Sequence, residues 1–473
     1  FRQILADYGI PYMFYTDRRT VFEKQPDKPV RFWGCNITED ANMMKERERK
    51  LFPKLIKQLG YNAVRLHHFD EHLMVKGAKF EIDKERLDRF FRTFAALKNA
   101  GLYVTIDLFT MRTSGFEDMH GKTAHIYKIL SWYHPAVRKN IERFAKEILS
   151  TKNPYTGMTM AEDPALISVG LINENPRLET HEEHKYPNTL KFWNDLYKPP
   201  FDAWCKEKGI TQTDHPTPET WAQFQMENHV KAFQHYKKFL RGLGVTVPVS
   251  DISNSSNLLL APIRQNFDYT DIHWYFDHPI VSPGFKPPFI FHNRSSLESI
   301  HRTPLASIAQ RQKGKPVMIT EWHFCCPNQY RAEGGAAGGA YAALNGINGI
   351  FDFNPVLFSY RWGEPMSSQH VPMGMFSTYD DPVNFHNALI TALLFLRGDV
   401  KEADREFLLR VSPDIYKDKN ALLYTNFGRK WRGQPLPSFT VFGAVGKIGI
   451  EVSAEKGGKD TFDNNELLKT CRN

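Results

Sequence analysis

Apolar residues along this chain follow two different spacings that alternate with each other. Short apolar runs of strand length recur, and between them apolar residues return every third or fourth position. The first spacing is typical of strands that are buried on both faces, and the second of amphipathic helices that pack on them. The expected strands are 31–37, 62–70, 103–109, 165–172, 247–253, 271–276, 316–322 and either 349–353 or 356–360. The alternation predicts an α/β fold, and eight strands fit a (β/α)8 TIM barrel better than an open doubly wound sheet.

Several of the expected helices have recognisable ends. One runs from Ala41 to Leu59 and stops at Gly60, a second begins at an Asp83 cap, and a third begins with Pro135 in its first turn. These residue types are typical of helix termini. Further helices are expected near 220–243, 297–313 and 382–397.

The chain divides into three regions by pattern. Residues 1–30 are irregular and are expected to be a lead-in segment, and residues 31–400 carry the alternating pattern of the barrel. Residues 401–473 contain short β-prone runs separated by Gly and Pro, which predict a small β-rich C-terminal module. Those runs are 407–411, 421–424, 439–442 and 448–452. The glycine-rich tract 334–339 is expected to be a flexible loop at the barrel mouth.

Composition excludes several classes of protein. The apolar content of 41% and charged content of 24% are those of a soluble globular enzyme, and no window approaches the ~18 apolar residues of a membrane span. Five cysteines without CxxC spacing argue against a disulfide scaffold and against structural zinc. The net charge is +8, but no long basic run is present, so a solvated basic surface is favoured over a nucleic-acid partner. The chain opens on Phe1, and we expect a secreted or periplasmic location; the sequence does not determine the oligomeric state.

Two glutamates are placed where chemistry is expected. The run 165–172 ends abruptly in Asn173 and Glu174, and the seventh expected strand ends in Glu321. In (β/α)8 barrels the catalytic residues lie where the strands end. A carboxylate there is costly unless it is paired, hydrogen-bonded or used, and each glutamate alone could form a salt bridge with an Arg or Lys. Together they suit glycoside hydrolysis, which needs one protonated and one ionised carboxyl group.

Short motifs on three expected strands resemble the clan-A glycoside hydrolases. Asn-Glu ends the fourth strand, His-x-Tyr lies on the sixth and Glu-Trp ends the seventh, in the style of the family-five cellulases and mannanases. The resemblance covers roughly residues 31–400 by topology, but at residue level only these motifs. The family pattern more often reads Asn-Glu-Pro, whereas here Asn175 stands before Pro176. The resemblance implies a carbohydrate substrate, double displacement with retained configuration, and no cofactor or metal.

The resemblance also implies a role for each motif residue. Glu174 matches the acid/base and Glu321 the nucleophile, while Asn173 matches the residue that holds the sugar 2-hydroxyl. Arg65 matches the strand-two arginine beneath the nucleophile, where it would lower the pKa of Glu321. The remaining matches are expected at the substrate: His273 and Tyr275 on the sixth strand, Trp322 after the nucleophile, and Trp362 as a sugar-stacking platform.

Other readings remain open. His67 and His68 suggest a metal, but an amidohydrolase-type barrel would need His-x-His on the first strand, which is absent. Adjacent residues point to opposite faces of a strand, so only one reaches the pocket, and we expect His67 to contact a sugar hydroxyl. The alternatives are a non-catalytic carbohydrate-binding barrel and a metal-dependent barrel hydrolase. The sugar stays undetermined among β-glucosides, β-mannosides and β-galactosides, and the excess of Lys and Arg allows an anionic polysaccharide.

Overall fold

The structure is a computed structural model that describes most of the chain. The described residues are 30–77, 79–116, 123–175, 197–211, 216–254, 257–282, 286–355, 374–418, 430–431 and 434–454. Trp362, the lead-in segment up to residue 29, the alternative eighth strand 356–360 and the β-prone run 421–424 lie outside them. The division of the chain at residues 30 and 400 therefore stays an expectation.

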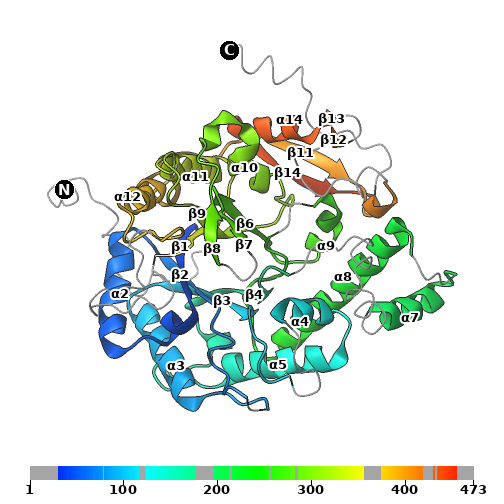
Figure 1. The fold of residues 1–473 in the computed structure, drawn as a ribbon, viewed down its shortest axis with the longest axis horizontal. Coiled ribbons are helices and arrows are strands. Elements are labelled where there is room, and N and C mark those ends of the chain that lie inside the picture. The colour runs from blue at the N-terminus through cyan, green and yellow to red at the C-terminus, as the bar shows by residue number, and fades with distance from the viewer. Residues whose placement is uncertain are drawn as a thin grey trace, which may run out of the picture.

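Eight parallel strands form a single sheet that curls into a nearly closed barrel (Figure 1). The strands lie in the order β5-β4-β3-β2-β1-β10-β9-β6, so β5 and β6, consecutive along the chain, form the two edges that face each other. The predicted (β/α)8 fold is confirmed. The strands are β1 Phe32–Thr38, β2 Ala63–His67, β3 Tyr103–Phe109, β4 Leu166–Ile172, β5 Val249–Ser250, β6 Thr270–Phe276, β9 Val317–Phe324 and β10 Gly349–Asp352.

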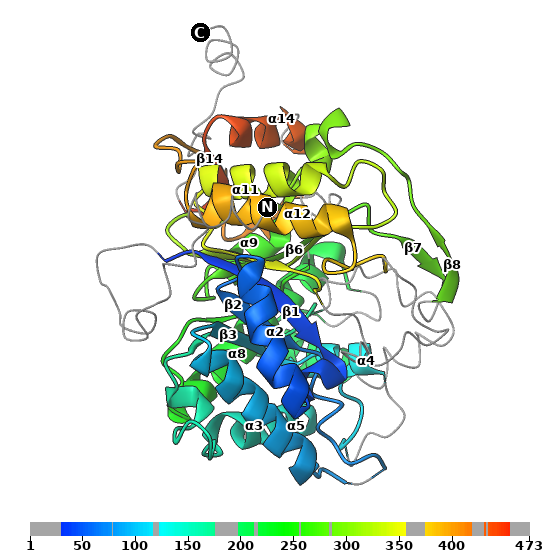
Figure 2. The ribbon, with the colours of Figure 1, turned by 90° about the vertical axis from the view of Figure 1, so that its left-hand side faces the viewer.

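Helices cover the outside of the barrel (Figures 1 and 2). Asp83 accepts hydrogen bonds from the backbone N–H groups of Glu85 and Arg86, which confirms the predicted cap. The main helices are α2 Glu46–Gln58, α3 Lys84–Asn99, α4 Ala124–Leu130, α5 Pro135–Ser150, α7 Lys198–Lys208, α8 Pro218–Gly242, α11 Glu333–Leu344 and α12 Pro382–Thr391. Among the described residues no helix is long and apolar enough to cross a membrane.

Two expected helices were wrong in length. The segment expected to be one helix at 297–313 contains only three short pieces, η7 Ser296–Glu298, η8 Ile300–Arg302 and α10 Leu305–Ile308. Pro304 stands directly before the last of them, and a proline disfavours helical backbone in the residue before it. The helix expected from Ala41 begins only at Glu46, after the 3-10 turn η2 Glu39–Met43.

The glycine-rich tract was predicted wrongly, because residues 334–339 lie inside helix α11. The four glycines of this tract let α11 approach its neighbours closely. A Cβ at Gly338 would come within 2.3 Å of the Trp322 ring, and one at Gly335 within 2.8 Å of the Asn387 backbone on α12. Close packing against β9 and α12 outweighs the low helix propensity of glycine.

The C-terminal module combines two small sheets with a helix. Strand β11 (Glu406–Val411) pairs in parallel with β14 (Lys447–Val452), and β12 (Lys430–Trp431) pairs antiparallel with β13 (Gln434–Pro435). The expected strand 439–442 was wrong, because α14 (Leu436–Val441) and a 3-10 turn occupy it. Arg311 joins the module to the barrel, since its Nε donates to the carbonyl of Ile448 at 2.8 Å.

The close fit of α11 predicts opposite effects for two glycine substitutions. Gly338→Ala should lower the free energy of unfolding by about 1–3 kcal/mol, because the new methyl group overpacks against Trp322. Gly242→Ala, in α8, is the matched control. Nothing lies within 4 Å of a Cβ there, so it should stabilise by about 0.5–1 kcal/mol. Urea denaturation of both variants measures the two changes, and equal effects would contradict the packing argument.

Candidate active site

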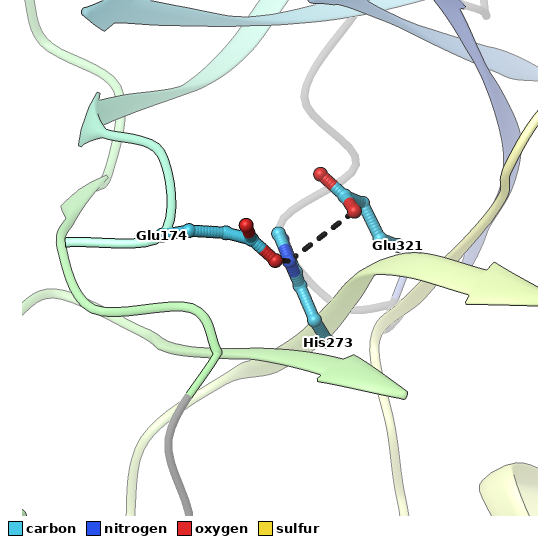
Figure 3. Close-up of side chains that lie close together, drawn as sticks. All are labelled: Glu174, His273 and Glu321. Atoms are coloured by element: carbon cyan, nitrogen blue, oxygen red, sulfur yellow. Dashed lines mark hydrogen bonds and ion pairs between the residues drawn. The ribbon is translucent and has the colours of Figure 1, made fainter. Parts of the chain in front are cut away.

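The candidate site lies at the C-terminal ends of the strands, inside the barrel mouth. The side chains of Glu174, His273 and Glu321 converge there from two strands and from the turn after a third (Figure 3). One ligand atom of each lies within 4.8 Å of those of the other two. Glu174 follows β4, His273 lies on β6 and Glu321 on β9, so the fold brings together residues up to 147 positions apart, the difference between 321 and 174.

Arg65 fills the centre of the barrel beneath these residues. Its side chain is fully buried, and the guanidinium contacts two carboxylates, Glu321 Oε1 at 2.9 Å and Asp107 Oδ2 at 2.6 Å. It also donates to the Oδ1 atoms of Asn36 at 2.9 Å and Asn173 at 2.8 Å. Burial would lower the pKa of Arg65, but the surrounding carboxylates raise it above its ordinary value. The charge is therefore permanent.

Glu321 is the buried carboxylate of the pair. Arg65 and the Tyr275 hydroxyl donate to its two oxygens, the latter to Oε2 at 2.6 Å, and His67 Nε2 lies 3.2 Å from Oε1. Burial alone would raise the pKa of Glu321, but His273, His67 and Arg65 hold it well below its ordinary value. The predicted ionised state is supported, although His273 rather than Arg65 supplies the largest lowering effect.

His273 bridges the two glutamates. Its Nδ1 lies 3.1 Å from Glu174 Oε1 and 3.3 Å from Glu321 Oε2. Its Nε2 lies 3.1 Å from the hydroxyl of Thr320, which itself donates to Asp271 at 2.6 Å, so Nε2 must be a donor too. Two donating nitrogens describe an imidazolium. Burial lowers the pKa of His273, but the two glutamates raise it above its ordinary value.

Glu174 is the more accessible carboxylate, with 42% of its side chain exposed, against 6% for Glu321. Burial of its carboxyl group pushes the pKa of Glu174 up, but the hydrogen bond and charge of His273, together with the charge of Lys128, outweigh burial and hold the pKa below its ordinary value. The sequence led us to expect a protonated Glu174. The lowered pKa of Glu174 and the raised pKa of His273 favour the opposite arrangement, with the proton on His273 between the two carboxylates.

The backbone is strained where the strands end. Glu174 has φ of 44°, and His68 after β2 and Ile252 after β5 have φ of 52° and 54°. Residues with side chains rarely adopt this left-handed conformation, which is typical of functional sites. The N–H of Glu174 donates to the Ser253 hydroxyl at 3.1 Å, which helps to hold the turn.

Asn175 anchors the segment that follows Glu174. Its amide donates to Asp251 Oδ2 at 2.8 Å, and the same oxygen accepts from His229 Nε2 at 2.9 Å. All three side chains are buried. The residue that departs from the Asn-Glu-Pro pattern therefore ties the end of β4 to the residue after β5 and to α8.

Seven of the nine predicted site residues come together. Arg65, His67, Asn173, Glu174, His273, Tyr275 and Glu321 are joined by the contacts given above. Trp322 is not among them: it is buried, its ring stacks on Trp274 with centroids 4.7 Å apart, and it faces α11. The expected substrate contact of Trp322 is therefore wrong, because it alternates with Glu321 along β9 and points outward. Trp362 lies outside the described residues.

Sequence reasoning missed several residues of the site. Asp107 lies on β3 and binds both Arg65 and His67, whose Nδ1 donates to its Oδ2 at 2.8 Å. Asn36 and Asp271 are buried on β1 and β6, and burial raises the pKa of Asp271 to about 6. A signal was available in each case, because each is a polar residue inside an apolar strand.

The three converging side chains have the residue types of a metal site, but their hydrogen bonds fit one poorly. Both oxygens of Glu321 already accept a hydrogen bond, one from Arg65 and the other from Tyr275. A metal cation would also face the buried guanidinium of Arg65. The donor set therefore suits a bridging imidazolium better than a bound ion.

Comparison with known proteins finds the same fold in solved structures. No protein-family model and no curated protein matches the sequence. Three solved structures resemble it at 13% identity. A β-galactosidase from Halorubrum lacusprofundi has a TM-score of 0.54, and the match covers 90% of this chain and 68% of that one. GH5_18 from Streptomyces cattleya, solved in complex with GlcNAc, has a TM-score of 0.53, and the match covers 89% of this chain and 94% of that one. A glycoside hydrolase family 5 mannosidase from Rhizomucor miehei has a TM-score of 0.50, and the match covers 79% of this chain and 95% of that one. At this identity the similarity shows a shared barrel fold.

The bridging position of His273 predicts its titration. In the wild-type protein a histidine signal should titrate above 6.5, because two carboxylates favour the charged imidazole. Glu174→Gln removes one of them and should move that titration to lower pH. Proton NMR of the imidazole signals measures the change, and His273→Asn identifies the signal by its loss. An unchanged titration in Glu174→Gln would contradict the hydrogen bond between the two residues.

Proposed function

We propose that this protein is a glycoside hydrolase that cleaves O-linked β-glycosides by double displacement and retains the anomeric configuration. The observation that carries this proposal is the pair of glutamates bridged by His273, with one carboxyl oxygen of each within 4.8 Å of one oxygen of the other. Retaining enzymes hold their two carboxyl groups roughly 5–5.5 Å apart, and inverting enzymes roughly 6.5–9.5 Å. The shorter separation favours direct attack by one of them.

The environments of the two glutamates assign their roles. Glu321 is buried and held ionised, so it acts as the nucleophile that attacks the anomeric carbon. The bond from that carbon to the glycosidic oxygen breaks, and the oxygen takes a proton from the more exposed Glu174. In the second step water attacks the glycosyl–Glu321 ester and gives its proton to Glu174.

The acid is the coupled pair of Glu174 and His273. His273 Nδ1 donates to Glu174 Oε1 at 3.1 Å, so its proton can pass to Glu174 as Glu174 protonates the leaving group. Interacting groups of this kind titrate as a unit. The raised pKa of His273 favours a proton on the pair, so the pair can act as an acid although the pKa of Glu174 is lowered.

Asn173 is oriented to hold the sugar. Its Oδ1 accepts from Arg65, which leaves the amide Nδ2–H2 as the group available to a sugar hydroxyl. The comparison proteins include a mannosidase and a β-galactosidase, and both sugars stay candidates together with glucose. A panel of aryl β-glycosides and β-linked polysaccharides would identify the preferred sugar.

The acid role predicts a selective loss in Glu174→Gln. Hydrolysis of substrates with poor leaving groups should fall by about 10²–10⁴-fold, the usual contribution of general acid catalysis. Aryl glycosides of acidic phenols need little protonation, so formation of the glycosyl enzyme should survive on them. Pre-steady-state release of the phenol measures this step.

The control is Glu321→Gln, which should abolish both reactions. Assays in the presence of a chelator distinguish the proposed glycoside hydrolase from a metal-dependent barrel hydrolase, because the latter would lose activity without its ion. A non-catalytic barrel would hydrolyse neither substrate in any form. Equal losses on both substrate types in Glu174→Gln would remove the acid role.

The short carboxylate separation predicts the stereochemistry. On a β-linked substrate the first product should be the β-anomer, because two displacements at the anomeric carbon restore its configuration. Proton NMR during the first minutes distinguishes the anomers before mutarotation. An α-anomer appearing first would rule out Glu321 as the nucleophile, even if both glutamates proved essential.

A further inference from the structure

Lys128 is a buried cation for which the proposed chemistry has no use. It lies in α4 between Tyr127 and Ile129, and only 6% of the residue is exposed. A desolvated ammonium group costs several kcal/mol in rough terms unless a partner compensates it. A lysine inside a run of buried residues therefore needs an explanation.

The charges that act on Lys128 are those of the candidate site. Burial lowers the pKa of Lys128 and outweighs the carboxylates that raise it, which are, in order of effect, Glu174, Asp70, Glu321 and Asp107. Lys128 in turn lowers the pKa of His68 at the end of β2. Within the described part of the chain, none of these carboxylates forms an ion pair with its Nζ. The ammonium group is thus near the catalytic carboxylates without contacting one.

The turn after α4 packs beside the segment that carries Glu174. Trp132, four residues after Lys128, stacks on His229 with ring centroids 4.1 Å apart. His229 binds Asp251, which holds Asn175 next to Glu174. Lys128 precedes Trp132 by one helical turn, so it lies on the side of the site that carries Asn175 and Glu174.

We propose that Lys128 binds an anionic substituent of the substrate, a carboxylate or a sulfate ester, on the sugar next to Glu174. This inference rests on the proposed function and names its substrate class. A substrate anion would provide the direct partner that Lys128 lacks among the described residues, and a charge-assisted hydrogen bond in a desolvated site is strong. A neutral sugar would leave the ammonium group without a direct ion-pair partner among the described residues.

Binding of the anion also improves the acid. The positive charge of Lys128 contributes to the lowered pKa of Glu174. An anion on Lys128 cancels that effect, so Glu174 holds its proton more readily when the correct substrate is bound. Recognition and acid catalysis are therefore coupled through one side chain.

The test compares matched substrates. Oligosaccharides of β-1,4-glucuronan and β-1,4-mannuronan are paired with their carboxyl-reduced forms, and 6-sulfated β-linked oligosaccharides with their desulfated forms. The wild-type protein should prefer one anionic class by at least about tenfold in kcat/KM, and the preferred class tells carboxylate from sulfate. Lys128→Met should lower that ratio at least about tenfold, whereas Lys128→Arg should keep most of it.

Lys139→Met is the matched control, because it removes one charge from the exposed face of α5. It should leave the ratio unchanged, which excludes an effect of net charge. A second readout is the pH profile on a neutral substrate. Lys128→Met removes a positive charge near the pair of Glu174 and His273 and so raises the apparent pKa of the pair, and the alkaline limb of kcat/KM should move to higher pH. The wild-type protein and Lys128→Met both retain the other charged groups near Lys128, which are Asp70, Glu321, Asp107 and His68.

Three results would overturn the inference: no preference for either anionic class, an equal loss on anionic and neutral substrates in Lys128→Met, or an unmoved alkaline limb. Failure of the proposed function gives a different pattern, since no glycosidic bond would then be cleaved in any substrate. In that case calorimetric binding of the same oligouronates and sulfated oligosaccharides to wild type and Lys128→Met still tests the anion site. Weaker binding in Lys128→Met supports it, and equal binding removes it.

Discussion

The buried guanidinium of Arg65 is the interaction on which the site depends. It contacts Glu321 and Asp107 and donates to Asn36 and Asn173, so it joins β1, β2, β3, β9 and the end of β4. A barrel interior filled only by apolar side chains could not hold an ionised carboxylate at its mouth. The planar group with five donors satisfies these acceptors in fixed directions, which a lysine could not do. The same residue thus stabilises the barrel interior and orients the candidate nucleophile.

The charges above Arg65 form a graded arrangement. Glu321 is the most buried and the most strongly held in its ionised form, and Glu174 is half exposed and shares a proton with His273. Two carboxylates this close would repel each other, and the imidazolium between them removes that cost. The pair can then differ in function although both are glutamates on similar strand ends. Lys128 adds a further cation at longer range on the Glu174 side.

The outer shell of the protein serves this arrangement by close packing. The glycines of α11 allow the helix to lie directly on Trp322, which fixes the outer face of β9 opposite Glu321. On the other side, Trp132, His229 and Asp251 form a buried chain of contacts to Asn175. Rigid support of this kind holds reacting groups in a productive geometry. It also explains how Glu174 keeps its left-handed backbone, since the surrounding contacts determine it.

The sequence by itself determined the barrel and the two glutamates. Strand-length apolar runs alternate with helical spacing, and both glutamates stand at the polar ends of such runs, so local pattern was sufficient. It failed where the outcome depends on distant partners. The glycine-rich tract of α11 was predicted to be a loop because its packing partners, Trp322 and α12, are distant in the sequence. Trp322 was predicted to contact the substrate because the sequence alone does not determine which face of β9 its side chain lies on. Likewise the pKa of Glu174 and the role open to Lys128 arise from charges on other strands, which only tertiary structure brings together.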